Sequence, residues 1–257
     1  MKVKYFTAAV ALASVLAASA GDYKVNVPLS EDEEGAMAFL VDTDSGEKID
    51  SVLVTDGAAV FSGAIDVPVA ARIIIDGKRA GSLFLEPGNI EVDAKQRMSA
   101  GTPLNDAYNA LGARISDLAQ QFRAIEGDDE AANARRQHIQ ELYGNVVDSV
   151  MTANLENPLG YMLFLDGAYS MSLDELNKTL EEHPSLKKYK RVNALITAAT
   201  NKAATQPGCM YKDFSVTQPD GSVKKLSDYV GKGKFVLVDF WASWCGPCIR
   251  QTAVLKD

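Results

Sequence analysis

Two cysteines near the end of the sequence have the spacing needed for redox chemistry. Cys245 and Cys248 enclose Gly246 and Pro247, and they lie between an apolar run and the start of an expected helix. Residues three apart on one helical turn lie close enough to form a short disulfide. The free N–H groups and the dipole of a helix N-terminus favour the thiolate of the first cysteine. That thiolate can attack a disulfide in another molecule, and the second cysteine can then resolve the mixed disulfide.

Other uses of this cysteine pair fit less well. A structural zinc site needs four ligands, and the sequence offers neither a second such pair nor a histidine near the first. Attached c-type haem would need histidine at 249, where Ile249 stands. His138 and His183 lie in charged surroundings and are expected to be exposed helix residues. We therefore predict no metal and no cofactor. A structural disulfide remains the plain alternative.

The elements that must position the cysteines lie directly upstream. Residues 234–240 form a nearly continuous apolar run, which is typical of the buried central strand of a sheet. Residues 214–226 predict a hairpin, because Pro219-Asp220-Gly221 gives a turn signal between two short runs. Cys209 precedes this hairpin in a Pro-Gly turn. It is expected to be unpaired, with an intermolecular bridge as the alternative.

The rest of the chain predicts an α+β protein with two further regions. Residues 21–100 show short alternating strands separated by turn signals, which favours an antiparallel β sandwich or small barrel. Residues 101–204 predict helices, since apolar residues recur at three- and four-residue spacing along 104–122. A second helix over 129–155 should end at Asn157-Pro158, a third opens with a capping box at Ser172, and a fourth follows to about 203. Residues 205–257 form the last region.

The first twenty residues predict a cleaved signal peptide. Lys2 and Lys4 precede an apolar run over 6–18, and Ala18-Ser19-Ala20 gives the small-x-small cleavage pattern. A membrane anchor is the alternative, but the run is too short to span about 30 Å of hydrocarbon. The formal net charge of −8 argues against nucleic-acid partners. We expect a periplasmic protein with no stable membrane insertion after signal cleavage.

The segment around the cysteines resembles a known family. Val-Asp-Phe-Trp-Ala-Ser-Trp-Cys-Gly-Pro-Cys at 238–248 is similar to the active-site segment of the thioredoxin superfamily. The preceding residues 213–239 resemble its exported TlpA/ResA-like branch, the redoxin or AhpC/TSA-related thiol-disulfide oxidoreductases. The specific resemblance covers about 208–251, and exported relatives of this kind often carry an N-terminal β-rich domain of unknown function. The resemblance also implies that residues 205–257 are only the N-terminal part of a thioredoxin-like domain, lacking its later strands and cis-Pro loop.

The resemblance implies a role for each residue of the segment. Cys245 would attack and Cys248 would resolve, while Asp239 would be a buried acid that takes the proton from Cys248. Trp244, with Gly246 and Pro247, would contact the substrate, and Trp241 would pack beneath the loop. Gly-Pro between the cysteines is typical of reducing thioredoxins, near −270 mV. The implied partners are disulfide-containing envelope proteins and a membrane thiol-reducing protein that supplies electrons.

The sequence differs from the pattern of this family at some positions, and a second function is also compatible with it. Ala253 stands where relatives usually have a helix-kinking proline. Ala242 and Val238 stand where peroxidase relatives have Thr or Ser and Pro, which argues against peroxide reduction. The rival is an envelope binding protein in which the cysteine pair is a structural or vestigial disulfide.

Overall fold

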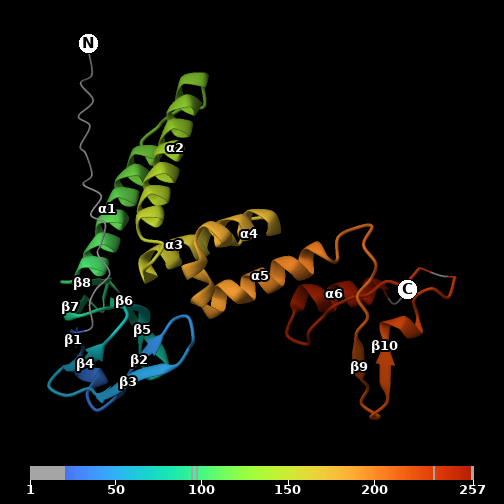
Figure 1. The fold of residues 1–257 in the computed structure, drawn as a ribbon, viewed down its shortest axis with the longest axis horizontal. Helices are drawn as coiled ribbons and strands as arrows, with labels where there is room; N and C mark the ends of the chain where they lie inside the picture. Colours follow the sequence, from blue (N-terminus) through green and yellow to red (C-terminus); the bar gives the residue numbers. More distant parts are fainter. Residues whose placement is uncertain (1–20, 94, 97, 234, 256–257) are drawn as a thin grey trace. The chain divides into compact units, whose positions relative to one another are not determined.

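Two sheets form the N-terminal part of the chain. The computed structural model describes residues 21–93, 95–96, 98–233 and 235–255, and the chain divides at 201/202 into two compact units (Figure 1). Within the described residues of the first unit, one four-stranded sheet has the order β4-β1-β7-β8 and the other the order β3-β2-β5-β6. The strands are β1 (Gly21–Pro28), β2 (Met37–Asp42), β3 (Lys48–Leu53), β4 (Ala58–Ile65), β5 (Val69–Ile75), β6 (Lys78–Leu85), β7 (Gly88–Asp93) and β8 (Met98–Ala100).

The core of this region lies between the two sheets. Alternate residues of each strand point inward, as the period of two requires. Val25 and Phe61 from the first sheet are fully buried in the same cluster as Leu40 and Ile73 from the second. The predicted sandwich is therefore confirmed. The barrel alternative is wrong, because no strand ladder joins the two sheets among the described residues.

One strand pair departs from the antiparallel prediction. β1 and β7 run parallel, with Val25 opposite Ile90, while the other described pairs of the sandwich are antiparallel. The chain crosses from β4 to the second sheet for β5 and β6, and it returns as β7 on the free side of β1. Parallel neighbours need such a long crossover connection, whereas local turn signals predict hairpins.

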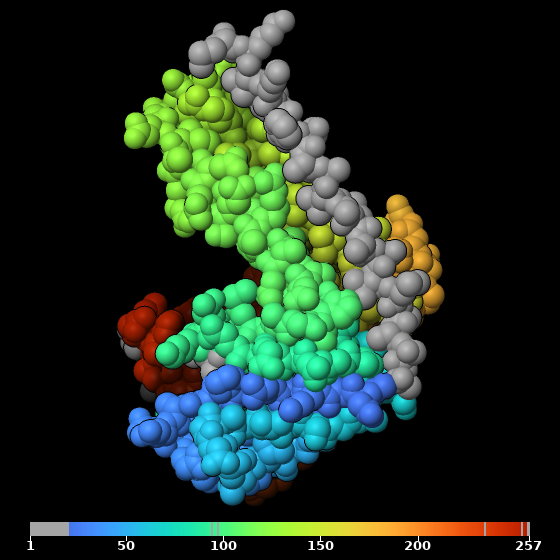
Figure 2. All heavy atoms as spheres, turned by 90° about the vertical axis from the view of Figure 1, so that its left-hand side faces the viewer, coloured from blue at the N-terminus to red at the C-terminus, as the bar shows by residue number. Residues whose placement is uncertain are grey.

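Helices cover the outer face of the second sheet. The helices of the first unit are α1 (Pro103–Arg123), α2 (Glu130–Ala153), α3 (Pro158–Ala168), α4 (Leu173–Glu182) and α5 (Lys190–Ala203), whose last residues pass into the second unit. Phe84 of β6 points away from the sandwich core and is buried with Leu104 of α1 and Leu159 of α3. Figure 2 shows α1, in green, rising from the blue-to-teal strands. β6 is thus buried on both faces.

Buried polar groups fix the start of α1 against β6. The Asn105 side chain donates to the carbonyl of Phe84 at 2.8 Å and accepts from its N–H at 2.9 Å. It takes the place of a neighbouring strand at the edge of the second sheet. At the preceding residue, Glu86 Oε1 accepts the N–H of Leu104 at 2.7 Å. These bonds satisfy backbone groups that burial would otherwise leave unpaired.

The helical region contains one helix more than expected. The Asn157-Pro158 pair lies beyond the end of α2, as predicted, but it also begins α3. The Asn157 side chain accepts the N–H of Leu159 at 3.0 Å, and Pro158 occupies the first helical position, where its missing N–H costs nothing. A helix-breaking pair is therefore also a helix start. None of the helices in the described residues is long and apolar enough to cross a membrane.

The described residues of the second unit form a hairpin, a short 3-10 turn and one α-helix. These elements are β9 (Ser215–Thr217), β10 (Val223–Lys225), the 3-10 turn at Leu226–Asp228 and α6 (Gly246–Leu255). The predicted hairpin is confirmed, with Val216 opposite Lys224. The strand predicted over 234–240 does not form: residues 235–240 are exposed and belong to no strand, and Lys234 lies outside the described residues. An apolar strand needs hydrogen-bonded neighbours, and the hairpin pairs only with itself within the described chain.

Candidate redox site

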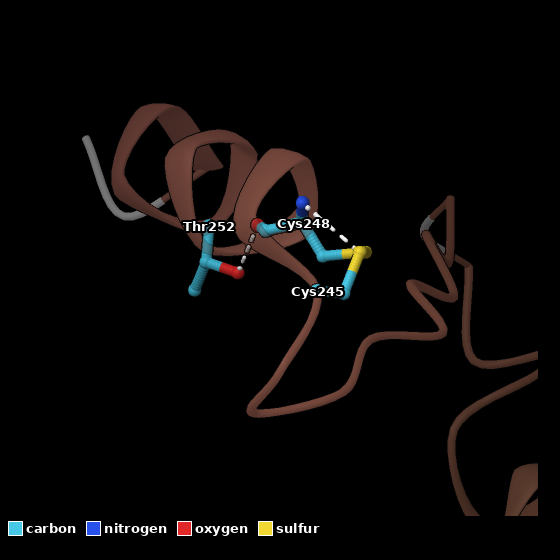
Figure 3. The surroundings of a disulfide bond; sticks show 3 residues. All are labelled: Cys245, Cys248 and Thr252. Atoms are coloured by element: carbon cyan, nitrogen blue, oxygen red, sulfur yellow. Dashed lines mark hydrogen bonds between the residues drawn. A yellow bond between two sulfur atoms is a disulfide. The ribbon is translucent and has the colours of Figure 1, made fainter.

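The two cysteines meet in a disulfide across the first turn of α6 (Figure 3). Their Cα atoms are 5.3 Å apart, a usual separation for this bond. Cys245 immediately precedes the helix, and its carbonyl accepts the N–H of Ile249 at 3.1 Å. The N–H of Cys248 points at Cys245 Sγ, at 3.3 Å. Cys245 therefore stands where an N-cap residue stands, with its sulfur in the position of the capping oxygen.

This position determines the electrostatics of the first sulfur. N–H groups at a helix start are not used within the helix, and the helix dipole places partial positive charge there. A Cys245 thiolate would accept the Cys248 N–H that points at its sulfur in the disulfide. The Arg250 guanidinium lies beside Gly246, the residue after Cys245, with its Nη1 3.7 Å from where a Cβ on Gly246 would be. Arg250 was not singled out from the sequence, although its spacing from Gly246 is one helical turn.

The other predicted site residues lie near the cysteines in sequence but are exposed. Trp244, the residue before Cys245, is 87% exposed, so its aromatic ring is open to solvent. Asp239 is exposed too, and no hydrogen bond joins it to either cysteine among the described residues. The buried position implied for this acid is therefore wrong for the described chain. Its burial would require the sheet that residues 235–240 do not form here.

Hydrogen bonds between Asp213 and Ser227 join the start of the hairpin to the turn that follows it. Asp213 accepts the N–H and the hydroxyl of Ser227, each at 2.8 Å. The N–H of Ser227 is the larger cause that holds the pKa of Asp213 below its usual range. The ring of Phe214 lies 5.9 Å from that of Phe240, which brings the hairpin against the segment leading to the cysteines.

The remaining thiol and the histidines take no part in a described cluster. Cys209 is exposed and unpaired, with its Sγ 3.7 Å from the carbonyl of Ala203. His138 is exposed on α2, and His183 follows α4 at its C-terminal end, half-buried. In the part of the chain that the structure describes, no group of three metal-ligating side chains comes together.

Comparison with known proteins places both ends of the chain. Residues 207–257 match the AhpC/TSA family, and residues 23–108 match the Domain of unknown function (DUF4369). The C-terminal segment is thus similar to the AhpC/TSA family and to ResA-like proteins, and it follows a region that matches DUF4369.

Several relatives named for thiol-disulfide or thioredoxin chemistry each match a quarter of this chain or less. The thiol-disulfide oxidoreductase ResA of Geobacillus kaustophilus is 40% identical over 58 residues, which is 23% of this chain and 32% of the relative. The thioredoxin-like protein YneN of Bacillus subtilis is 34% identical over 64 residues, 25% of this chain and 36% of that protein. A thioredoxin of Mycolicibacterium smegmatis is 55% identical over 31 residues, 12% of this chain and 28% of the relative. The chain spans about a third of the length of these relatives.

Proposed function

We propose that this protein is an exported thiol-disulfide oxidoreductase that reduces disulfides in envelope proteins through Cys245 and Cys248. The observation that carries the proposal is the Cys245–Cys248 disulfide at the start of α6, with the Cys248 N–H directed at Cys245 Sγ. The names of the ResA and YneN relatives support the same reaction class.

The reaction balances over two thiol-disulfide exchanges. In the reduced protein, the Cys245 thiolate attacks one substrate sulfur, forms a mixed disulfide and expels the other substrate sulfur as a thiolate. Cys248 then loses its proton and attacks Cys245 Sγ, which releases the second substrate thiolate. The substrate gains two electrons, and the protein ends with the Cys245–Cys248 disulfide. We propose Asp239 as the acceptor of the Cys248 proton in a complete thioredoxin-like domain.

Partners and location belong to the same proposal. Disulfide-containing envelope proteins would be the substrates, with Trp244, Gly246 and Pro247 in contact with them. A membrane thiol-reducing protein would return electrons to the Cys245–Cys248 disulfide. The predicted signal peptide over 1–20 lies outside the described residues, and we propose that it directs the chain to the periplasm. Mass spectrometry of the exported protein should find Gly21 as the first residue, and retention of Met1 would contradict export by cleavage.

The test compares three variants, each with one cysteine replaced by serine, in an insulin-reduction assay. Cys245→Ser should abolish turnover, because no thiol remains to attack. Cys248→Ser should also stop turnover and accumulate a mixed disulfide that mass spectrometry detects. Cys209→Ser is the matched control and should leave the rate unchanged, because Cys209 is exposed and unpaired. In a complete thioredoxin-like domain, Asp239→Asn should slow release from the mixed disulfide more than its formation, and equal slowing of both steps would contradict the proton-acceptor role.

The rival binding function predicts a different result. If the wild-type chain shows no turnover and dithiothreitol reduces its disulfide only after unfolding, the cysteine pair is structural. A complete chain extended through the strands implied by the resemblance is the positive control for this comparison.

A further inference from the structure

An open apolar groove runs along the α1–α2 helix pair of the first unit. α1 and α2 lie side by side in Figure 1. A cavity of about 720 Å³ lies where they approach β6 and α3, and a second of about 300 Å³ lies further along the pair. Both cavities are lined by Ile115 of α1 and Tyr143 of α2, so they are two ends of one groove.

The groove is lined by regular rows of apolar residues. On α2, Ile139, Tyr143, Val147 and Met151 recur at every fourth position and therefore share one helix face. Among all the residues of α2, which the structure describes in full, Ala132 alone is fully buried. Tyr143 is 48% exposed, and Tyr108 of α1, which lines the same cavity, is 45% exposed. Ile139, Val147 and Met151 are half-buried, and Met151 packs against the cluster of α3 and α4, so Tyr143 is the exposed member of the row. A half-covered apolar row on a long helix is typical of a helix–helix interface.

The two ends of the groove carry opposite charge. Asp148 and Asp166 line the cavity next to the sheet, where Arg79 is the one cation among the lining residues. Arg79 is already held, because its guanidinium donates to Ser82 Oγ. Arg123 is the charged residue that lines the opposite end. The groove thus runs from a net acidic end to a basic end.

The opposite charges at the two ends of the groove favour a partner whose charges run the other way. We propose that the groove binds a second copy of this chain, with the two α1–α2 pairs packed antiparallel about a two-fold axis near Ile115 and Tyr143. The axis brings the acidic end of each groove opposite the basic end of the other. At 1.5 Å per helical residue, Arg123 lies about 12 Å along α1 from Ile115 at the proposed axis. Asp148 lies about 7.5 Å along α2 from Tyr143 at the same axis, in the opposite direction. The long arginine side chain covers the difference, so Arg123 of each copy reaches Asp148 of the other.

The test is the oligomeric state of the mature chain by sedimentation velocity. Tyr143→Glu places a charge at the axis twice and should weaken dimerisation at least tenfold. Val60→Glu is the matched control: Val60 is exposed on the opposite side of the sandwich core and should leave the dimer unchanged. Circular dichroism should show that both variants stay folded.

A charge exchange tests the two-fold arrangement itself. Arg123→Glu and Asp148→Arg should each weaken the dimer, since each opposes like charges across the interface. The double variant should restore the wild-type dissociation constant to within a few-fold. A monomeric wild type at all concentrations overturns the proposal, and so does a double variant no better than the singles. Association that survives Tyr143→Glu but disappears with Leu237→Glu would place the contact in the second unit and overturn it equally.

Discussion

Glu86 shows how burial and hydrogen bonding compete at a single residue. Its side chain is 1% exposed at the start of α1, where it accepts the Leu104 N–H. That N–H and the hydroxyl of Thr102 favour the carboxylate, but burial favours the neutral acid more. Burial therefore raises the pKa of Glu86 above its usual range. The folded protein binds this proton more tightly than the unfolded chain does.

The sign of the resulting pH dependence is fixed. Because the folded-state pKa is the higher one, the Glu86 contribution to stability is fully present below the unfolded pKa and is lost as pH rises through the folded pKa. Glu86→Gln keeps an oxygen acceptor for Leu104 and cannot ionise. We expect it to remove this loss, so that its advantage over wild type grows with pH in urea titrations between pH 4 and 8.

Glu86→Ala is the matched comparison. It leaves the Leu104 N–H buried without an acceptor and should lower the free energy of unfolding by about 1–3 kcal/mol. Equal pH dependence in wild type and Glu86→Gln would show that Glu86 does not titrate differently on folding.

At the scale of elements, one turn of the sandwich holds a distant helix. Asp44, after β2, accepts the N–H of Lys190 at 2.7 Å and that of Arg191 at 2.9 Å, which are the first two residues of α5. The hydroxyl of Tyr161 donates to the same carboxylate at 2.9 Å, and the ring of Tyr161 stacks on Tyr189 at 3.7 Å. Burial and the Asp44 carboxylate raise the pKa of both tyrosines well above their usual range. Asp44 therefore caps α5 from another element.

Removing this cap should destabilise the first unit. Asp44→Ala leaves two helix N–H groups and the Tyr161 hydroxyl without their acceptor, and we expect a loss of about 2 kcal/mol in urea unfolding. Glu47→Ala is the control, because Glu47 makes only an exposed ion pair with Lys190, at 3.3 Å, and should change stability by less than about 0.5 kcal/mol. Similar losses in the two variants would contradict a capping role for Asp44.

At the scale of the whole molecule, the two units differ in how they bury apolar residues. The sandwich fully buries Val25, Leu40 and Ile73 between its sheets. In the second unit, Phe235, Leu237 and Phe240 are exposed, although the sequence there is the most apolar of the C-terminal region. Without strand partners, backbone N–H groups of this segment can bond only to water.

Hydrogen exchange should separate the two units. Amides of residues 235–240 are expected to exchange at nearly unprotected rates, while those of β1, β2 and β5 should be protected to the level of global unfolding. Equal protection in a monomer would show that the second unit folds by itself. A complete domain, with strands on both sides of this segment, should protect it.

The features that the sequence alone determined are local ones. The pair Cys245 and Cys248 at a helix start follows from four residues, because their spacing and the helix turn have the same length scale. The capping box at Ser172 is local in the same way, and it forms as predicted. The alternating strands of the sandwich also follow from short patterns, since one face of each strand must be buried.

Only the tertiary structure decided the features that depend on distant partners. The parallel pairing of β1 with β7, the cap that Asp44 gives α5 and the burial of Glu86 each join residues far apart in sequence. The apolar run at 235–240 has the pattern of a buried strand, yet it forms none in the described chain. A strand forms only when its backbone hydrogen-bonds to neighbouring strands, so its own residues set only a preference for the strand conformation. The residue pattern of a segment determines which secondary structure it favours, and contacts with distant segments determine whether that structure forms.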